Sequence, residues 1–294
     1  MAGRATDPSP ESTASAIARL YDLDLSEDPG DVELYRALAR RTGGPILELA
    51  VGSGRIAVPL AADGHRVVGV DIDPAMLARG RARADAAGPA IAARIELFEG
   101  DMTEAGDDPR VVAAGPYRLA ILALNSIIIL GSADLQRAAL ASMARLLEPG
   151  GLAVVDVWLP VPTDLAAFDG RLSLDWLRID PESGREVTKM SAAWFDPVSR
   201  RVTLTTIFEE AEQGTTPVRW TRADALRLVT ADELTSYAAD AGLQVEQLAG
   251  DHEFGPLGAG ADRVILVARK VGPKASPSSP PRGSPRRPSE PSPR

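Results

Sequence analysis

The 294-residue sequence contains no cysteine and only two histidines. Disulfides, thiolate nucleophiles and cysteine-ligated metals are therefore excluded, and a histidine-rich metal site would have too few ligands. We expect any chemistry carried out by this chain to be metal-free.

Long apolar runs are also missing. No stretch reaches the roughly 18–20 consecutive apolar residues that a membrane helix needs. The opening residues, MAGRATDPSPEST, lack the basic-then-apolar pattern of a secretory signal. These absences predict a cytoplasmic protein that does not bind membranes.

Acidic residues outnumber basic ones outside the last 24 residues. The whole chain carries a net charge of −9 and residues 271–294 carry +4, so the remainder carries −13. An acidic body repels nucleic acid. We therefore expect a small-molecule partner and no nucleic-acid partner. Nothing in the sequence indicates the oligomeric state.

Composition divides the chain into four parts. Residues 271–294 are rich in Pro, Ser and Arg and have few apolar side chains, so we expect a disordered tail. Residues 1–14 are expected to be a flexible N-terminus. Residues 15–160 and 229–270 are expected to form the core, and residues 161–228 are expected to form an insert that caps it.

The core has an α/β pattern. Between residues 45 and 157, short runs rich in Val, Ile and Leu alternate with amphipathic stretches, as in a parallel sheet buried on both faces. Five strands are predicted, at residues 45–50, 66–71, 94–101, 117–125 and 152–158, with helices at 55–62, 74–87 and 134–147 and a turn at 148–151. Asp73 is predicted to cap the helix that opens at Pro74.

The pattern changes after the fifth strand. Residues 171–228 alternate apolar and polar residues between turn clusters, which predicts an antiparallel β insert. A capping box at 230–233 begins a helix that ends near Gly242. Two last strands follow, at 243–250 and 263–270, and the short connection between them predicts an antiparallel pair.

A glycine-rich turn is the strongest sign of a ligand site. Gly52 and Gly54 lie where the first strand gives way to a helix, and they allow a ligand to approach backbone N–H groups near the positive helix end. Asp71 ends the second strand, nineteen residues later, where a carboxylate can accept both hydroxyls of a ribose. This pattern alone also fits a nicotinamide dinucleotide site.

Further segments distinguish a nicotinamide dinucleotide site from a site for another adenosine-containing cofactor. The stretch ILELAVGSGRIAVPLAADGHRVVGVDIDPAML, followed by EGDM, LNS and LLEPGG, resembles the class I S-adenosylmethionine-dependent methyltransferases from about residue 35 to 270. The resemblance implies a Rossmann-like seven-stranded sheet with an antiparallel last strand, helices on both faces and, here, a small antiparallel insert after the fifth strand. One departure is Ala50, where the family often has glycine.

The resemblance also assigns roles in binding S-adenosylmethionine. Glu48, Gly52 and Gly54 would frame the methionine part, and Asp71 would hold the ribose. Adenine would be bound by the three remaining residues of the set: Ile72 against the ring, Asp101 at the exocyclic amine and the backbone of Met102 at the ring edge.

Three residues are candidates for the acceptor side. His252 follows the sixth strand and is the first candidate for a general base, although an ordinary loop role is the commoner fate of such a residue. Asn125, after the fourth strand, can orient an acceptor or serve only the turn. Tyr21 precedes the first strand, in a segment that folds over the cofactor in the proteins that this chain resembles. Trp158, Trp194 and Trp220 form either an apolar roof over the acceptor or a core for the insert.

We therefore predict an enzyme that transfers methyl from S-adenosylmethionine to an amine, hydroxyl or carboxyl of a small molecule by in-line displacement. Two alternatives stay open. One is a non-catalytic binding or regulatory protein with the same fold. The other is an NAD(P)-dependent oxidoreductase, which the absence of an obvious Tyr-x-x-x-Lys pair disfavours.

Overall fold

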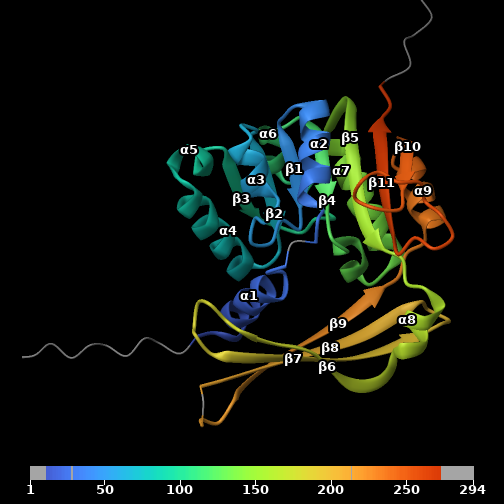
Figure 1. Ribbon diagram of the computed structural model, residues 1–294. Helices are drawn as coiled ribbons and strands as arrows, with labels where there is room; N and C mark the ends of the chain where they lie inside the picture. The colour runs from blue at the N-terminus through green and yellow to red at the C-terminus, as the bar shows by residue number, and fades with distance from the viewer. Residues whose placement is uncertain (1–10, 28, 213, 273–294) are drawn as a thin grey trace, which may run out of the picture.

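The computed structural model describes residues 11–27, 29–212 and 214–272 (Figure 1). Its main feature is a seven-stranded sheet in the order β10-β11-β5-β4-β1-β2-β3. The strands are β1 (Ile46–Leu49), β2 (Val67–Asp71), β3 (Ile95–Glu99), β4 (Tyr117–Leu122), β5 (Leu147–Trp158), β10 (Leu243–Ala249) and β11 (Arg263–Lys270). Strands β1 to β5 pair in parallel, and β11 is antiparallel to both of its neighbours. The predicted sheet, including its antiparallel last strand, is confirmed.

Helices bury both faces of this sheet, as the alternation along its strands requires. In β4, Leu119 and Ile121 pack with one layer of helices, while Ala120 and Leu122 pack with the other. The first layer consists of α2 (Val32–Thr42), α3 (Ala57–Ala62), α4 (Pro74–Ala87) and α5 (Pro89–Ala92), and the second of α6 (Pro109–Ala114), α7 (Ala133–Leu146) and α9 (Ala231–Asp240). The core therefore lies on both sides of one sheet, and the ends of its strands remain for a site.

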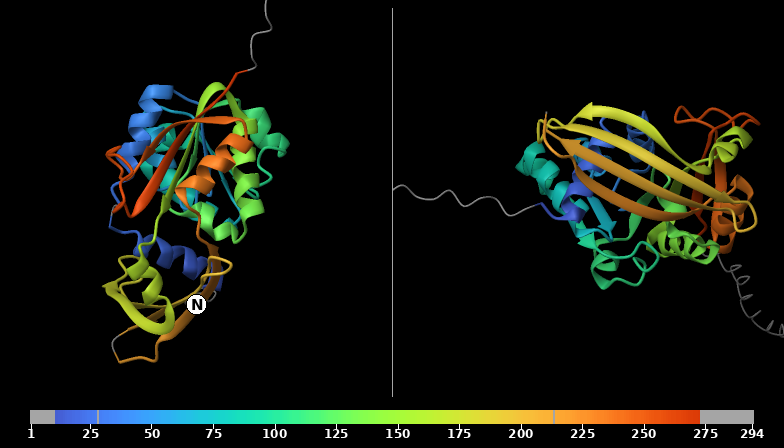
Figure 2. Two further views of the ribbon diagram at one scale, coloured as in Figure 1. Left: turned by 90° about the vertical axis from the view of Figure 1, so that its right-hand side faces the viewer. Right: turned by 90° about the horizontal axis from the view of Figure 1, so that it is seen from below.

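A four-stranded antiparallel sheet follows β5, after the short helix α8 (Pro162–Ala167). Its strands, in sequential order, are β6 (Asp169–Ile179), β7 (Glu186–Asp196), β8 (Arg201–Ala211) and β9 (Val218–Arg227). This sheet lies beyond the carboxyl ends of the parallel strands, and helix α1 (Thr13–Asp24) lies between it and the core (Figures 1 and 2). The predicted insert after the fifth strand is confirmed.

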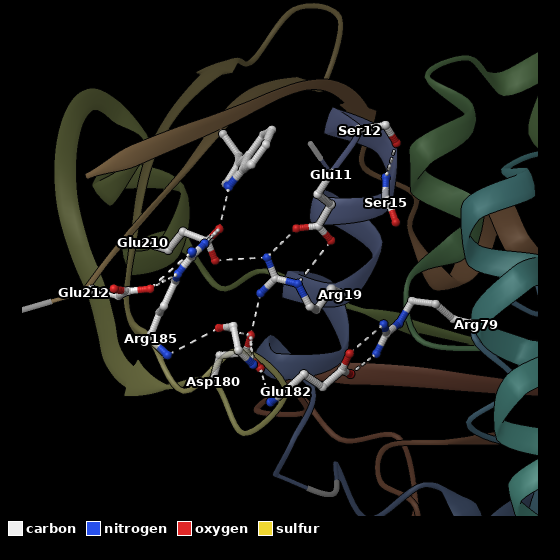
Figure 3. Close-up of polar contacts among 12 residues, drawn as sticks. Glu11, Ser12, Ser15, Arg19, Arg79, Asp180, Glu182, Arg185, Glu210 and Glu212 are labelled. Atoms are coloured by element: carbon white, nitrogen blue, oxygen red, sulfur yellow. Dashed lines mark hydrogen bonds and ion pairs between the residues drawn. The ribbon is translucent and has the colours of Figure 1, made fainter. Parts of the chain in front are cut away.

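Helix α1 joins the insert through both apolar and charged contacts. Leu20 and Leu23 pack against Val187 and Phe208 of the insert. Beside them, the guanidinium of Arg19 binds three carboxylates (Figure 3), which belong to Glu11, Asp180 and Glu210. Because two of these carboxylates are buried, α1 and the insert behave as one packed unit.

Some boundaries differ from the sequence predictions. Helix α3 begins at Ala57, not at residue 55. Gly54 has a φ of +75°, and the two residues after it are still in the turn. Strand β5 already begins at Leu147 and runs through the turn expected at 148–151. Helix α1 starts at Thr13, where Ser12 caps it, inside the segment that was expected to be flexible.

The predicted disordered tail lies outside the described residues, apart from residues 271 and 272. Among the residues that the structure describes, no helix combines the length and apolar character needed to cross a membrane.

Candidate cofactor-binding site

The turn after β1 has a backbone that only small residues adopt easily. Gly52 and Gly54 have φ values of +55° and +75°. A Cβ on Gly52 would lie 3.1 Å from Cε of Met76, on helix α4, so the turn and the helix are in close contact. Ala50 also has a positive φ of 55°, at the position where the family often has glycine, and this conformation costs an L-residue about 1–2 kcal/mol. The turn is therefore tight, and strain is concentrated in it.

Asp71 fixes this turn from the neighbouring strand. Its Oδ2 accepts a hydrogen bond from the backbone N–H of Gly52 at 2.8 Å, and its Oδ1 accepts one from the N–H of Asp73 at 2.9 Å. Because β1 and β2 are adjacent and parallel, their carboxyl ends meet at one edge of the sheet. Burial raises the pKa of Asp71 above its usual value, although the hydrogen bonds from these amides oppose the shift.

The next two candidates flank Asp71. Ile72 is 69% exposed, an unusual state for a large apolar side chain, and it follows directly after β2. Asp101 lies one residue beyond Gly100, whose N–H donates to the carbonyl of Asp71 at 3.0 Å. Oδ1 of Asp101 accepts from both the N–H and the hydroxyl of Thr103, at 2.8 and 2.7 Å. An apolar surface and a carboxylate therefore lie on either side of Asp71.

Met102, the last residue assigned to adenine, is partly buried and packs against the main hydrophobic core. Contact between its backbone and the ring edge stays a prediction. Asp73 caps helix α4 through the N–H of Ala75, as predicted.

Glu48 is the most unusual group at this edge. Its side chain is buried, and its Oε2 has no hydrogen-bond partner among the residues that the structure describes. Burial raises the pKa of Glu48 from 4.5 to about 8, in spite of the nearby guanidinium of Arg55. That guanidinium is itself held by the buried carboxylate of Asp31, with bonds of 2.6 and 2.7 Å. A buried carboxyl oxygen without a partner is costly, so Oε2 indicates a position prepared for a polar or cationic ligand group.

Helix α1 closes over the glycine turn. Asp22 accepts from the hydroxyl of Ser53 at 2.5 Å and pairs with Arg79 of α4 at 2.6 Å. Tyr21, the preceding residue, is partly buried, and its burial raises its pKa while the charges of Arg55 and Arg222 oppose the shift. Since Arg222 belongs to the insert, Tyr21 lies between the glycine turn and the insert. No motif around Asp22 indicates this role.

A second polar cluster lies at the ends of β5 and β11. His252 follows β10, and its Nε2 lies 3.0 Å from Oδ2 of Asp156 and 2.8 Å from the guanidinium of Arg263. Asp156 is fully buried, and Arg263 also binds its Oδ1 at 2.6 Å. The hydroxyl of Tyr35 lies 3.5 Å from the same carboxylate. His252 is therefore held in place by partners that the sequence analysis did not single out.

Asn125 bridges β4 and β5. It has a left-handed backbone with a φ of 67°, and its Oδ1 accepts from the N–H of Trp158 at 2.6 Å. This contact makes Asn125 part of the turn at the sheet edge. Whether it also orients an acceptor stays a prediction.

Trp158, Trp194 and Trp220 have different surroundings. Trp220 packs with the cluster that joins α1 to the insert, whereas Trp194 is largely exposed. Trp158 contacts Phe168, with ring centroids 6.0 Å apart. Trp220 therefore belongs to a core, and an aromatic roof over the acceptor stays a prediction.

Apart from Tyr21 on α1, the predicted residues fall into two groups along the carboxyl-end edge of the sheet. One group lies at the ends of β1, β2 and β3 or directly after them and comprises Glu48, Gly52, Gly54, Asp71, Ile72, Asp101 and Met102. The other, Asn125 and His252, lies at the ends of β4 and β10. A separate cavity of about 410 Å³ lies between Leu165 of α8, Phe195 of β7 and Thr230 at the start of α9. The residues that line it include none of the predicted site residues.

Comparison with known proteins agrees with this geometry. Residues 46–151 match the family model of a methyltransferase domain. Two curated sequences match short stretches. One is an uncharacterized RNA methyltransferase from Parasynechococcus marenigrum, 46% identical over 59 residues, which are 20% of this chain and 12% of that protein. The other is a putative methyltransferase from Geobacillus, 34% identical over 98 residues, which are 31% of this chain and 38% of that protein. The chain thus spans well under half the length of either relative.

Solved structures resemble most of the chain. The CcbJ methyltransferase from Streptomyces caelestis is 24% identical with a TM-score of 0.68, covering 84% of this chain and 98% of that one. An S-adenosylmethionine-dependent methyltransferase from Clostridium acetobutylicum is 14% identical with a TM-score of 0.69, covering 89% and 100%. The sugar N-methyltransferase KedS8 from Streptoalloteichus is 21% identical with a TM-score of 0.66, covering 92% and 99%. At these identities the likeness shows the fold. Residues 46–151 therefore form a methyltransferase domain, within a chain that has the fold of the class I S-adenosylmethionine-dependent methyltransferases.

Proposed function

We propose that this chain transfers a methyl group from S-adenosylmethionine to an amine of a small molecule. The observation that carries the proposal is the meeting of the glycine turn with Asp71, where the carboxylate binds the N–H of Gly52 at 2.8 Å. A hydroxyl and a carboxyl are the other acceptor groups that the sequence analysis left open.

The residues at this edge fit the cofactor. Asp71 keeps lone pairs for ribose hydroxyls while it accepts from backbone amides. The exposed side chain of Ile72 offers an apolar surface to an adenine ring, and Asp101 offers a carboxylate to its amine. The buried Oε2 of Glu48, which has no partner, matches the cationic ammonium of a methionine group. Gly52 and Gly54 would let that group approach the backbone.

Methyl transfer requires no nucleophilic side chain from the protein. The bound cofactor supplies an electrophilic methyl group on a sulfonium. The chain must then align the acceptor, exclude water and accept the proton that an ammonium loses before attack or that an amine or hydroxyl loses on methylation. Within this proposal His252 takes the proton, Asn125 orients the acceptor, and Tyr21 lines the acceptor pocket from helix α1. The contact of His252 with the buried Asp156 supports its role, because it fixes the imidazole.

The acceptor class rests on charge and on the likeness to other structures. The body of the chain carries −13, which favours a cationic or neutral acceptor. KedS8 is described as a sugar N-methyltransferase, and CalS10, from Micromonospora echinaspora, as an amino pentose methyltransferase. We propose an amino-sugar-like acceptor, held between the core of residues 15–160 and 229–270 and a cap formed by residues 161–228.

A labelled methyl donor tests the proposal directly. The purified chain is incubated with methyl-labelled S-adenosylmethionine and a panel of amino sugars, matched neutral sugars and RNA, and the products are read by mass spectrometry. We expect label on the amino sugars and not on the neutral sugars or RNA. Label on RNA alone, or no binding of the cofactor, would overturn the proposal.

A further inference from the structure

We infer that the outer face of the insert sheet is a docking surface for a second copy of this chain. The inner face is already used, because Val187 and Phe208 pack against Leu20 and Leu23 of helix α1. The outer face points away from the core and stands in front of the rest of the protein when it is seen from below (Figure 2). In the part of the chain that the structure describes, no element packs across it.

A bulge in β6 makes this face apolar. Leu174 pairs with Met190 and Trp176 pairs with Lys189, so Asp175 is an extra residue in the ladder. The extra residue changes which face the following side chains take. Trp176 therefore points to α1, where its indole N–H binds Asp24 at 2.7 Å.

The consequence is an apolar strip along the outer edge of the sheet. Without the bulge, simple alternation would divide the apolar residues of β6 between the two faces. With it, four of them share the outer face with one tryptophan of β7, and all five are between 54% and 65% exposed. They are Leu172, Leu174, Leu177, Ile179 and Trp194.

The middle of the face is also uncharged. The ladder places small or apolar residues beside the strip, namely Thr188, Met190, Ala192, Thr205, Ile207, Thr221 and Ala223. The charged pair Arg219 and Glu209 lies at one end of the strands. A partner must therefore be flat and apolar itself.

A second copy of the chain meets this requirement. Two sheet faces of equal twist pack on each other at about 10 Å, and an isologous contact uses the same patch twice. At roughly 100 Å² for each of the five large side chains, the strip offers about 500 Å². The neighbouring Met190, Ile207 and small residues extend this toward the roughly 800 Å² per partner of a stable interface. The opposite face and α1 stay with the core, so each protomer keeps its own cofactor site.

Single substitutions on the face test the inference. We expect the full chain at low micromolar concentration to have twice its monomer mass of 31.0 kDa by light scattering after size exclusion. Leu174→Arg should weaken the dimer at least a hundredfold, because it buries a charge at the centre of the contact. Val112→Arg is the matched control, since Val112 is 50% exposed on α6, and it should leave the dimer intact.

The absence of native cysteine gives a second readout that does not depend on a disruptive change. Single-cysteine variants Leu172→Cys and Leu174→Cys should form covalent dimers with a short bis-maleimide, whereas Val112→Cys should not. A monomeric wild-type chain, or a dimer that is unaffected by Leu174→Arg and is not cross-linked through β6, would overturn the inference. So would a monomer that sediments with phospholipid vesicles, because the face would then have a different occupant.

Discussion

Replacing Glu48 by Gln tests whether the buried acid is kept for a ligand. Gln has the same shape as the protonated acid but cannot ionise. Glu48 is buried with Oε2 unpartnered, and burial raises its pKa from 4.5 to about 8. The folded protein therefore holds a proton here that the unfolded chain releases at neutral pH.

The raised pKa fixes the sign of the pH dependence. Stability from the protonated acid is fully present below about pH 4.5 and is lost as the pH rises to about 8. At about 1.4 kcal/mol for each pKa unit, the total loss is roughly 3–5 kcal/mol. Glu48→Gln removes this loss, so its free energy of unfolding should exceed that of the wild type, and the gap should widen by about 2–3 kcal/mol between pH 6 and pH 9.

Urea unfolding of both proteins without ligand, at steps from pH 6 to pH 9, measures this gap. Lower pH is avoided because the sequence pI is about 4.9. The same variant should bind S-adenosylhomocysteine more weakly, because the ammonium of the ligand would favour the ionised form of Glu48, whereas Gln cannot ionise. Parallel stability curves, or unchanged affinity for the ligand, would refute the reasoning.

Three other substitutions, one of them with a control variant, probe separate parts of the account. Ala50→Gly should stabilise the chain by up to about 1 kcal/mol in thermal unfolding, because relief of the positive φ exceeds the entropy cost of glycine; a destabilised variant would show that the turn is not strained. Arg19→Ala should lower the free energy of unfolding in urea by about 3–5 kcal/mol, because it leaves two buried carboxylates unpaired. As a control, Arg171→Ala, at a side chain that is 89% exposed, should change this free energy by less than about 0.5 kcal/mol. His252→Ala should lower kcat by about 10²-fold or more with cofactor affinity unchanged, as expected for loss of a general base; an unchanged kcat would remove His252 from the proposal.

Local patterns were sufficient to predict the sheet and the meeting of the glycine turn with Asp71. The alternation of apolar runs with amphipathic helices gave the order of elements, and β1 and β2 are neighbours in the parallel sheet. Because the carboxyl ends of such strands meet, Gly52 and Asp71 could be placed together from their positions alone. The antiparallel last pair followed from the short connection before residue 263.

Long-range partners were not predictable in the same way. Asp156 contacts His252 across 96 positions, and Asp22 contacts Ser53 across 31. Each residue alone looks like an ordinary polar residue, and only the packing of distant elements brings it to its partner. The bulge at Asp175 could not be predicted either. The pattern of apolar and polar residues in one strand does not show where its register against the neighbouring strand shifts by one residue.

Calorimetric titration of S-adenosylhomocysteine into the wild type and into Asp71→Ala measures the central claim most directly. The account predicts one ligand bound per wild-type chain and a dissociation constant raised more than tenfold in the variant, since each charge-assisted bond to a hydroxyl contributes about 1.5–3 kcal/mol. Equal affinity of the two proteins, or no heat of binding in the wild type, would contradict it.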